Sequence, residues 1–258
     1  MSGAPVIEPL EGRSYLSADL VPAISGSLPP ALVTGGKFKS NVVVTITNQG
    51  DAAYAGPATL DLLASTDQTP DAGDTPVSSI SGNLKLKPGA SKSFKVKSGT
   101  VPALADGDYF LLAQVTDSAG AVRSAGSTTS SHVAPAFVDL TGALPGPIPA
   151  SLARGASATV AVTITNGGNV TAKGNANIGF RVSPSGTPSQ SDQRLGSKSI
   201  GLSLAPGASK TFKLKFVVPS GLLTGTYFLV AEIDNLNAIA ESDEGNNDAV
   251  SATTMTIT

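Results

Sequence analysis

The chain has 258 residues, a formal net charge of −2, no cysteine, no tryptophan and a single histidine. Without cysteine it can form no disulfide, no thiolate metal site and no cysteine nucleophile, and its small net charge gives no electrostatic reason to expect nucleic acid or an anionic membrane as a partner. No segment approaches 18 consecutive apolar residues, so a transmembrane helix is excluded and no membrane insertion is expected.

Residues 1–17 are predicted to form an N-terminal segment outside the folded domains, without the basic start and apolar core of a secretion signal. The first clear strand follows at residues 42–47, where Val42, Val44 and Ile46 share one face in the period-two pattern of a half-buried strand. Residues 48–51, Asn-Gln-Gly-Asp, then predict a turn, because Asn and Gly tolerate positive φ.

A loop at residues 65–74 gathers three aspartates, Asp67, Asp71 and Asp74. Several carboxylate and carbonyl oxygens on one flexible loop suit a hard cation, so calcium is the candidate cofactor and these three residues are the candidate metal ligands. Their spacing does not match an EF-hand. The alternative is that Asp, Pro and Gly serve here only as turn formers.

Lysines then alternate with apolar residues on both sides of a Pro-Gly-Ala turn. Leu84 and Leu86 alternate with lysines before the turn, and Phe94 and Val96 do so after it. This pattern predicts strands with one solvated face, on which the lysines discourage pairing of exposed edges.

Tyr109 lies two residues before Leu111, which takes the position of a core cysteine in immunoglobulin-type sandwiches. We expect its ring to be buried and its hydroxyl to bond the backbone, which would pin the corner of a sandwich. The absence of tryptophan shows that the domains are not antibody-like.

The whole pattern returns 118 residues later. Residues 44–48 recur at 162–166, residues 88–97 at 206–215 and residues 107–113 at 225–231, with Tyr227 in place of Tyr109. A repeat of this length should carry its own core. The sequence therefore predicts an all-β protein made of two tandem immunoglobulin-like antiparallel β-sandwiches with Greek-key connections. Their predicted bounds are residues 18–133 and 134–258, with strands opening the two domains at Leu20 and Leu140.

The second copy differs from the first in three places. Residues 226–244 have helix-like apolar spacing, but the aligned segment of copy one contains Gly120, so we predict strand, hairpin, strand in both copies. Ser185 and Ser189 replace two of the three aspartates and only Asp192 remains, which confines the predicted calcium site to copy one. A second acidic cluster, Glu241, Asp243, Glu244 and Asp248, is open to the same two interpretations, and Asn246 and Asn247 are expected to bond the hairpin backbone.

No constellation of catalytic residues is visible. The one histidine, His132, is predicted to lie in the linker between the copies, which excludes a histidine-based triad in a core and a two-histidine zinc helix. Gly174 to Gly179 has the spacing of a phosphate-binding loop, but the following Lys-Ser/Thr is missing. We therefore predict no catalytic and no cofactor-binding residues and expect the protein not to be an enzyme.

Several of these segments together resemble the CARDB family of bacterial adhesion-related domains. They are the Val-Thr-Ile-Thr-Asn strand and turn, the loop at 65–74, the Pro-Gly-Ala-Ser turn, the Gly-x-Tyr-Phe-Leu strand and the acidic ending at 239–247, and the resemblance spans roughly residues 18–133 and 136–258. It implies an immunoglobulin-like fold and a non-enzymatic adhesive or spacer role in secreted or surface proteins. Copy one lacks the acidic ending, having Arg-Ser-Ala-Gly at 123–126, so any role of that ending is not shared.

Residues 7–19 resemble the LEPR-XLL type of N-terminal motif, with Gly12 where that motif has proline. The resemblance implies an address or processing element. We thus expect an extracellular or cell-surface structural or adhesion module whose partners are other surface proteins, an extracellular polymer or copies of itself. The alternatives are a filament or surface-layer subunit that uses a terminal strand, a carbohydrate-binding accessory module and, as the different class, an enzyme.

Overall fold

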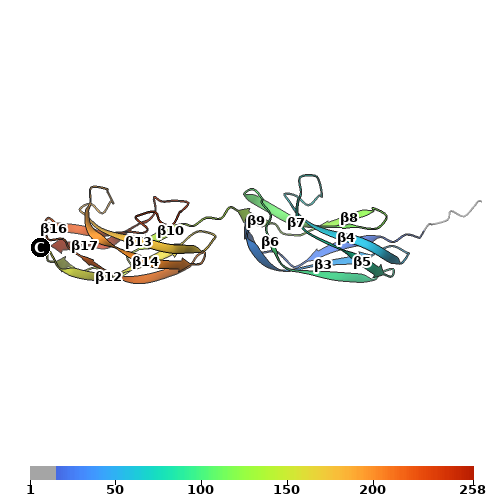
Figure 1. Ribbon diagram of the computed structural model, residues 1–258, viewed down its shortest axis with the longest axis horizontal. Helices are drawn as coiled ribbons and strands as arrows, with labels where there is room; N and C mark the ends of the chain where they lie inside the picture. Colours follow the sequence, from blue (N-terminus) through green and yellow to red (C-terminus); the bar gives the residue numbers. More distant parts are fainter. Residues whose placement is uncertain (1–15) are drawn as a thin grey trace, which may run out of the picture. The chain divides into compact units, whose positions relative to one another are not determined.

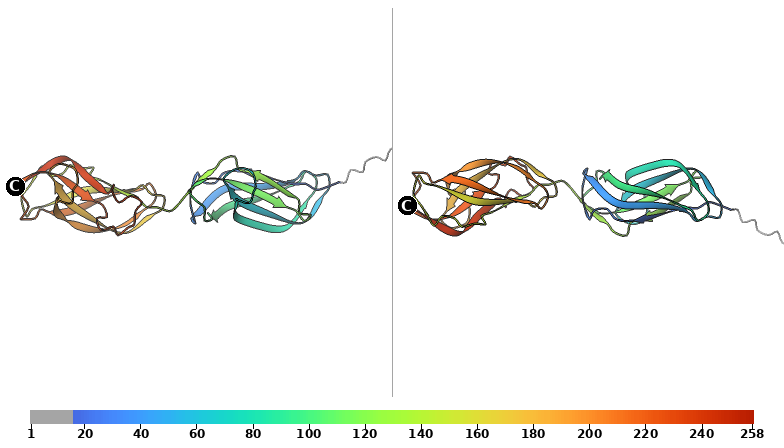
Figure 2. Two further views of the ribbon diagram at one scale, coloured as in Figure 1. Left: turned by 90° about the horizontal axis from the view of Figure 1, so that it is seen from above. Right: turned by 90° about the horizontal axis from the view of Figure 1, so that it is seen from below.

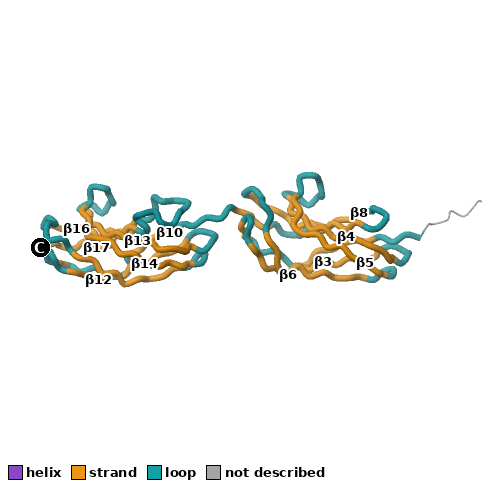
Figure 3. The backbone as a smooth tube through the Cα atoms, viewed as in Figure 1, coloured by secondary structure: helices purple, strands orange, loops and turns teal. Residues whose placement is uncertain are grey.

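The computed structural model describes residues 16–258, which form two compact units that are treated separately below (Figure 1). Unit 1 ends at Pro135 and unit 2 begins at Ala136, two residues after the predicted boundary. The described residues contain strands and loops but no α-helix, as Figure 3 shows. The resemblance of residues 7–19 to a surface-protein motif concerns mainly residues outside the described part.

Unit 1 is a sandwich of two sheets. One sheet has the strand order β1-β3-β6, and the other has the order β2-β9-β7-β4-β5, with β8 also paired to β7. The strands are β1 (Leu20–Ser25), β2 (Ala31–Val33), β3 (Lys37–Asn48), β4 (Tyr54–Ser65), β5 (Thr75–Leu86), β6 (Ser91–Thr100), β7 (Gly107–Thr116), β8 (Val122–Gly126) and β9 (Ser131–Ala134).

Unit 2 repeats this arrangement. Its sheets have the orders β10-β12-β15 and β11-β17-β16-β13-β14, and the two layers of each unit are visible in Figure 2. The strands are β10 (Leu140–Ala143), β11 (Ser151–Leu152), β12 (Ser157–Asn166), β13 (Ala172–Ser183), β14 (Gln193–Leu204), β15 (Ser209–Val217), β16 (Gly225–Glu232) and β17 (Asp248–Ile257). The single long β17 takes the place of β8 and β9 together.

The connections are of the Greek-key kind. The chain passes from one sheet to the other between β3 and β4, returns between β5 and β6, and crosses again between β6 and β7. All paired strands are antiparallel except β2 with β9 and β11 with β17, which are parallel. The protein is therefore all-β with an immunoglobulin-like fold, as predicted.

The period-two pattern places the core as expected. Val42, Val44 and Ile46 are almost completely buried, as are the equivalent residues Val160, Val162 and Ile164 of unit 2. Between them, threonine hydroxyls on the outer face bond serine hydroxyls of the neighbouring strand, as in the pair Thr45–Ser93. The alternating lysines of β5 and β6 are exposed, which confirms the predicted solvated face.

The turn after β3 forms for a different reason from the predicted one. Neither Asn48 nor Gly50 has positive φ. Asn48 is instead fully buried and bonds the backbone, while Gly50 is required for close approach, because a Cβ there would lie 2.0 Å from the carbonyl oxygen of Ser17. In unit 2, a Cβ on Gly168 would lie 2.4 Å from the carbonyl oxygen of Phe137.

The hydroxyl bond of the predicted tyrosine corner is present in both units, but the rings of Tyr109 and Tyr227 are partly and not fully buried. The hydroxyl of Tyr109 donates to the carbonyl oxygen of Ala105 at 3.3 Å, and that of Tyr227 donates to Leu223 at 3.2 Å. Residues 226–244 contain no helix, as predicted, but β16 and β17 are joined by the long loop 233–247 and not by a tight hairpin. The additional loop residues become important in the site described next.

Candidate functional site

The aspartate loop of unit 1 is built from small turns. The Asp67 carboxylate accepts the Thr69 N–H at 2.6 Å, and the Asp71 carboxylate accepts the Gly73 N–H at 2.7 Å. Asp74 accepts the Asp71 N–H at 3.0 Å, so these two residues lie together and Asp67 caps a separate turn. Within residues 16–258, no group of three or more His, Asp or Glu side chains is arranged to hold a metal ion. Calcium binding by Asp67, Asp71 and Asp74 stays a prediction.

His132 lies in β9 and not in a linker, which corrects the predicted position. Its ring is about half exposed, and its two nitrogens contact carboxylate oxygens of Asp108 at 3.0 Å and Asp106 at 3.4 Å. The interaction is on the surface, and no described nucleophile is hydrogen-bonded to this ring.

In unit 2 the loop 233–247 is folded around a buried carboxylate. Asp234 is fully buried and has positive φ, and its carboxylate accepts the N–H of Ile239 at 2.7 Å and of Asn177 at 3.4 Å. Ile233 and Ile239 are buried in the core of unit 2. The loop is therefore anchored at its start and its middle.

The second half of this loop brings two glutamates onto one amide. Asn247 Nδ2 donates to Glu241 Oε1 at 3.1 Å and to Glu244 Oε2 at 3.4 Å. Glu241 also accepts the Leu140 N–H at 2.5 Å, and Asn246 Nδ2 donates to Asp139 at 2.8 Å. The prediction that Asn246 and Asn247 bond the hairpin backbone is thus wrong, because their amides bond carboxylates.

Two carboxyl groups near this loop have raised pKa values. The pKa of Glu241 is raised to about 7, mainly because burial removes water from its carboxyl group; the charges of Glu244 and Asp234 add to the rise, and the hydrogen bonds from Leu140 and Asn247 oppose it. The pKa of Asp248 is also raised, because surrounding protein removes water from its partly exposed carboxyl group and because Glu232 carries a like charge. Negative charge in this part of unit 2 is therefore not fully compensated.

A buried ion pair lies beside the loop. Arg181 is 4 % exposed, and its guanidinium contacts both carboxylate oxygens of Glu232, with Nε at 2.7 Å from Oε2. Arg181 Nη1 also donates to the Ser189 carbonyl at 2.9 Å. Unit 1 has Leu63 and Gln114 at the two equivalent positions of β4 and β7.

The ion pair forms one wall of a polar cavity of about 370 Å³. Carboxylates, guanidiniums and amides line it, namely Arg181, Gln190, Arg194, Glu232, Asn235, Asn237, Glu244, Asn247 and Asp248. Sequence reasoning missed Arg181, Glu232 and Asn235. A signal was present in β16, where Glu232 replaces Gln114 in a strand that otherwise repeats closely, whereas β13 differs from β4 at most positions and Arg181 does not stand out there.

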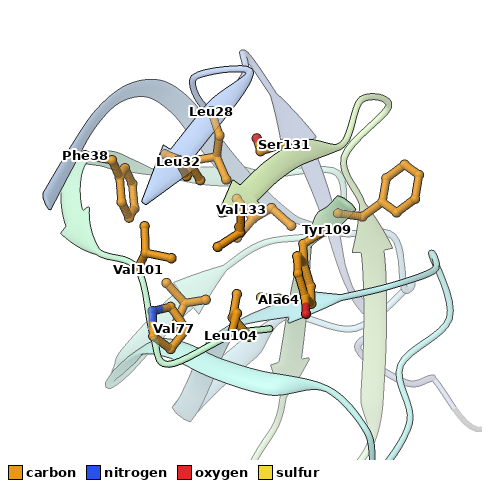
Figure 4. A pocket seen from close by; sticks show the side chains of 13 residues that line it. Leu28, Leu32, Phe38, Ala64, Val77, Val101, Leu104, Tyr109, Ser131 and Val133 are labelled. Carbon is orange, nitrogen blue, oxygen red and sulfur yellow. The ribbon is translucent and has the colours of Figure 1, made fainter. Parts of the chain in front are cut away.

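Unit 1 contains a small apolar pocket of about 30 Å³ at the end of its core (Figure 4). Ala64, Val77 and Ser131 line it. The strand registers place the larger Val182, Leu195 and Met255 at the equivalent positions of unit 2. The pocket is therefore a place where unit 1 has smaller core side chains.

Comparison with known proteins places a family within unit 2. Residues 146–251 match the model of the CARDB family, a non-catalytic immunoglobulin-like family. The match does not extend to unit 1, for which the resemblance stays a prediction. A search of curated proteins finds no match.

Three solved structures are similar to the chain. A crystal structure of a CARDB domain from Pyrococcus furiosus in complex with di-metal ions is 21 % identical with a TM-score of 0.33 and covers 47 % of this chain and 94 % of that one. A solution structure of the same domain gives the same identity, TM-score and coverage of this chain, with 96 % of its own length covered. Red sea bream transglutaminase is 18 % identical with a TM-score of 0.28, covering 96 % of this chain and 32 % of its own. No helix among residues 16–258 has the length and apolar character to cross a membrane.

Proposed function

We propose that this chain, in which a CARDB domain is found at residues 146–251, is a non-enzymatic structural and adhesion module of the cell surface or extracellular space. The family match supports an adhesion-related immunoglobulin-like role. The repeated fold supports a spacer made of two such modules, with unit 1 as a second CARDB-like domain. Its partners would be other surface proteins, an extracellular polymer or copies of the same chain.

One observation carries this proposal: in each unit a strand near the beginning pairs in parallel with the last strand. In unit 1, β2 lies parallel to β9, with the His132 N–H bonded to the Pro30 carbonyl at 2.8 Å and the Thr34 N–H to Ala134 at 3.0 Å. In unit 2, β11 lies parallel to β17, with the Thr256 N–H bonded to Ala150 at 2.9 Å.

This geometry suits a protein that is pulled by its ends. Force applied between the termini of a unit acts along two parallel strands in opposite directions, so the hydrogen bonds between them are loaded together and must break together. Strands joined by a tight hairpin would open one bond at a time. A spacer or adhesin experiences such tension, whereas a freely diffusing enzyme does not.

The test uses intact cells of the source organism. Antibodies raised against unit 2 should label intact cells, and deletion of residues 16–258 from the parent gene should reduce attachment while the other proteins of the surface stay in place. Labelling that appears only after lysis, with attachment unchanged, would contradict the proposal.

A carbohydrate-binding role has less support. Among the large hydrophobic side chains exposed in the described part, Phe137 is the one aromatic residue. Sugar rings usually stack on exposed aromatic faces, so the described surface offers little for such stacking. No observation favours this alternative over the spacer and adhesion role.

A further inference from the structure

We infer that unit 2 binds a hard divalent cation of the calcium class in its polar cavity, with the loop 233–247 supplying Glu244 and Asn247 as ligands. This site differs from the aspartate loop of unit 1 and includes Glu244 and Asp248 of the second acidic cluster. The inference concerns a binding property and does not depend on the proposed role at the cell surface.

The first observation is the position of unpaired polar atoms. Three buried side-chain atoms in residues 16–258 lack a hydrogen-bond partner, and they are the amide oxygens of Asn235, Asn246 and Asn247. All three belong to this one loop, and all three are acceptors. Buried polar atoms are normally paired, so each of them requires an explanation. The missing partner must be a donor or a cation.

Asn247 shows where that partner belongs. The residue is only 8 % exposed and lines the polar cavity. Its Nδ2 is held by Glu241 and Glu244, which leaves Oδ1 free to serve as a ligand.

The charges of the cavity favour a cation. Its lining carries the carboxylates of Glu232, Glu244 and Asp248 against the guanidiniums of Arg181 and Arg194. Arg181 is neutralised by Glu232, with which it forms the buried pair. Arg194 alone then stands against the two carboxylates of Glu244 and Asp248.

The ligand chemistry points to calcium. Calcium takes six to eight oxygen ligands from carboxylates, amide carbonyls and water in flexible geometry. The cavity supplies carboxylates and the amide groups of Asn235, Asn237 and Asn247, and its 370 Å³ leaves room for water ligands. Asn235 and Glu232 both lie over Gly179, where a Cβ would come within 2.6 Å of Asn235 Nδ2 and 2.9 Å of Glu232 Oε2.

Unit 1 cannot build this site. It has Leu63, Gln114 and Ser124 where unit 2 has Arg181, Glu232 and Asp248, and its tight turn at residues 117–121 replaces the long loop. We therefore expect one ion of this kind per chain, bound by unit 2.

The test is calorimetric titration of calcium into the chelator-treated full chain, together with thermal melts. We expect saturable binding with one ion per chain. At 100 times the dissociation constant, calcium should raise the melting transition of unit 2 by about ten degrees and leave that of unit 1 in place.

Two variants on the same loop distinguish a specific calcium site from a general effect of negative charge. Glu244→Gln replaces the carboxylate of an exposed residue by a neutral amide. It should weaken calcium binding by at least roughly tenfold, because the hard cation loses a charged ligand. Asp243→Asn removes the same charge one residue away, and an asparagine can still accept the Gly245 N–H. It should bind calcium within about twofold of the wild type, since exposed charges are screened by solvent.

Three results would overturn the inference. The first is no saturable calcium binding, which would mean that water alone satisfies the buried oxygens. The second is equal weakening by both substitutions, which would indicate a diffuse charge effect. The third is binding that Asp71→Ala abolishes and Glu244→Gln leaves intact, which would place the ion in unit 1. In chelator, Glu244→Gln must melt like the wild type, which shows that any loss of binding is not a loss of folding.

Discussion

At the scale of single residues, the buried asparagine at the end of β3 and of β12 holds each sandwich together. Asn48 Nδ2 donates to the carbonyl oxygens of Ala52 and Leu86, and its Oδ1 accepts the N–H groups of Asp19 and Gly50. One fully buried side chain therefore ties the first strand, the turn and the end of β5 to one another. Asn166 makes the equivalent four bonds in unit 2.

Replacing this asparagine should therefore be costly. Asn166→Ala leaves buried carbonyl and N–H groups without partners, and each such group costs on the order of 1–3 kcal/mol. We expect unit 2 to lose about 3 kcal/mol of unfolding free energy in urea titrations, with unit 1 unchanged. The exposed Asn83→Ala serves as the control and should shift neither transition. A loss below about 0.5 kcal/mol for Asn166→Ala would contradict the assigned role.

The buried ion pair of unit 2 allows a second residue-scale prediction. Arg181→Leu copies the residue found in unit 1 but leaves Glu232 buried without its partner, so unit 2 should lose roughly 3–5 kcal/mol. Arg181→Leu combined with Glu232→Gln copies unit 1 at both positions and should recover most of that loss. A double variant no more stable than Arg181→Leu alone would show that the charges are not the reason.

Individual side-chain roles were only partly predictable from the sequence. The tyrosine corner follows from a local motif, and the hydroxyls of Tyr109 and Tyr227 bond the backbone as expected, although their rings are only partly buried. The role of Asn48 was misjudged, because turn propensity concerns φ whereas its bonds reach residues 29 and 38 positions away. The partners of Asn246 and Asn247 also lie on other parts of the fold, which a local pattern cannot specify.

At the scale of elements, period-two alternation identified the strands because each strand has one buried face. The repeat then resolved residues 226–244, whose spacing alone resembles a helix. The long loop 233–247 was not predicted, because the aligned segment of unit 1 forms a tight turn at residues 117–121, around Gly120. For the end of unit 1 the sequence indicated one strand followed by a linker, whereas the structure has two separate strands, β8 and β9.

The apolar pocket of unit 1 gives a prediction about core packing. Ala64→Val introduces the residue that unit 2 has at the same position of β13, and it should raise the stability of unit 1 by about 1 kcal/mol by filling space and burying apolar surface. The reverse change, Val182→Ala, should lower the stability of unit 2 by about 2 kcal/mol. Thermal melts that resolve the two transitions measure both. A destabilised Ala64→Val would mean that the pocket cannot accept two more methyl groups.

At the scale of the whole molecule, each unit has its own hydrophobic core and its own parallel pair of early and last strands. The fold and the two-domain plan were accessible from the sequence because the duplication repeats strands, turns and corner residues together. The polar cavity was not accessible, because its residues come from β13, the loop after it, β14, β16, the loop 233–247 and the start of β17. The sequence groups Glu244 and Asp248 in one acidic cluster, but it does not link them to Arg181 or Glu232.

The parallel pairing can be weakened in one unit at a time. His132→Pro removes the N–H that bonds the Pro30 carbonyl, and proline cannot replace this donor. We expect the force that unfolds unit 1 to fall while the force that unfolds unit 2 stays the same. His132→Ala retains the backbone donor and is the matched control. Equal forces for the proline and alanine variants would show that the β2–β9 pair does not set the resistance.

The most direct test of a force-resisting spacer is single-molecule extension of the full chain from its two ends. The account predicts two separate unfolding peaks, each followed by a gain in length of roughly 35 nm, as expected for about 115 residues extended at 3.3–3.6 Å each less the folded length. A smooth extension without resolved peaks, or one peak that releases both units together, would contradict the view that the chain consists of two independent sandwiches built to resist pulling.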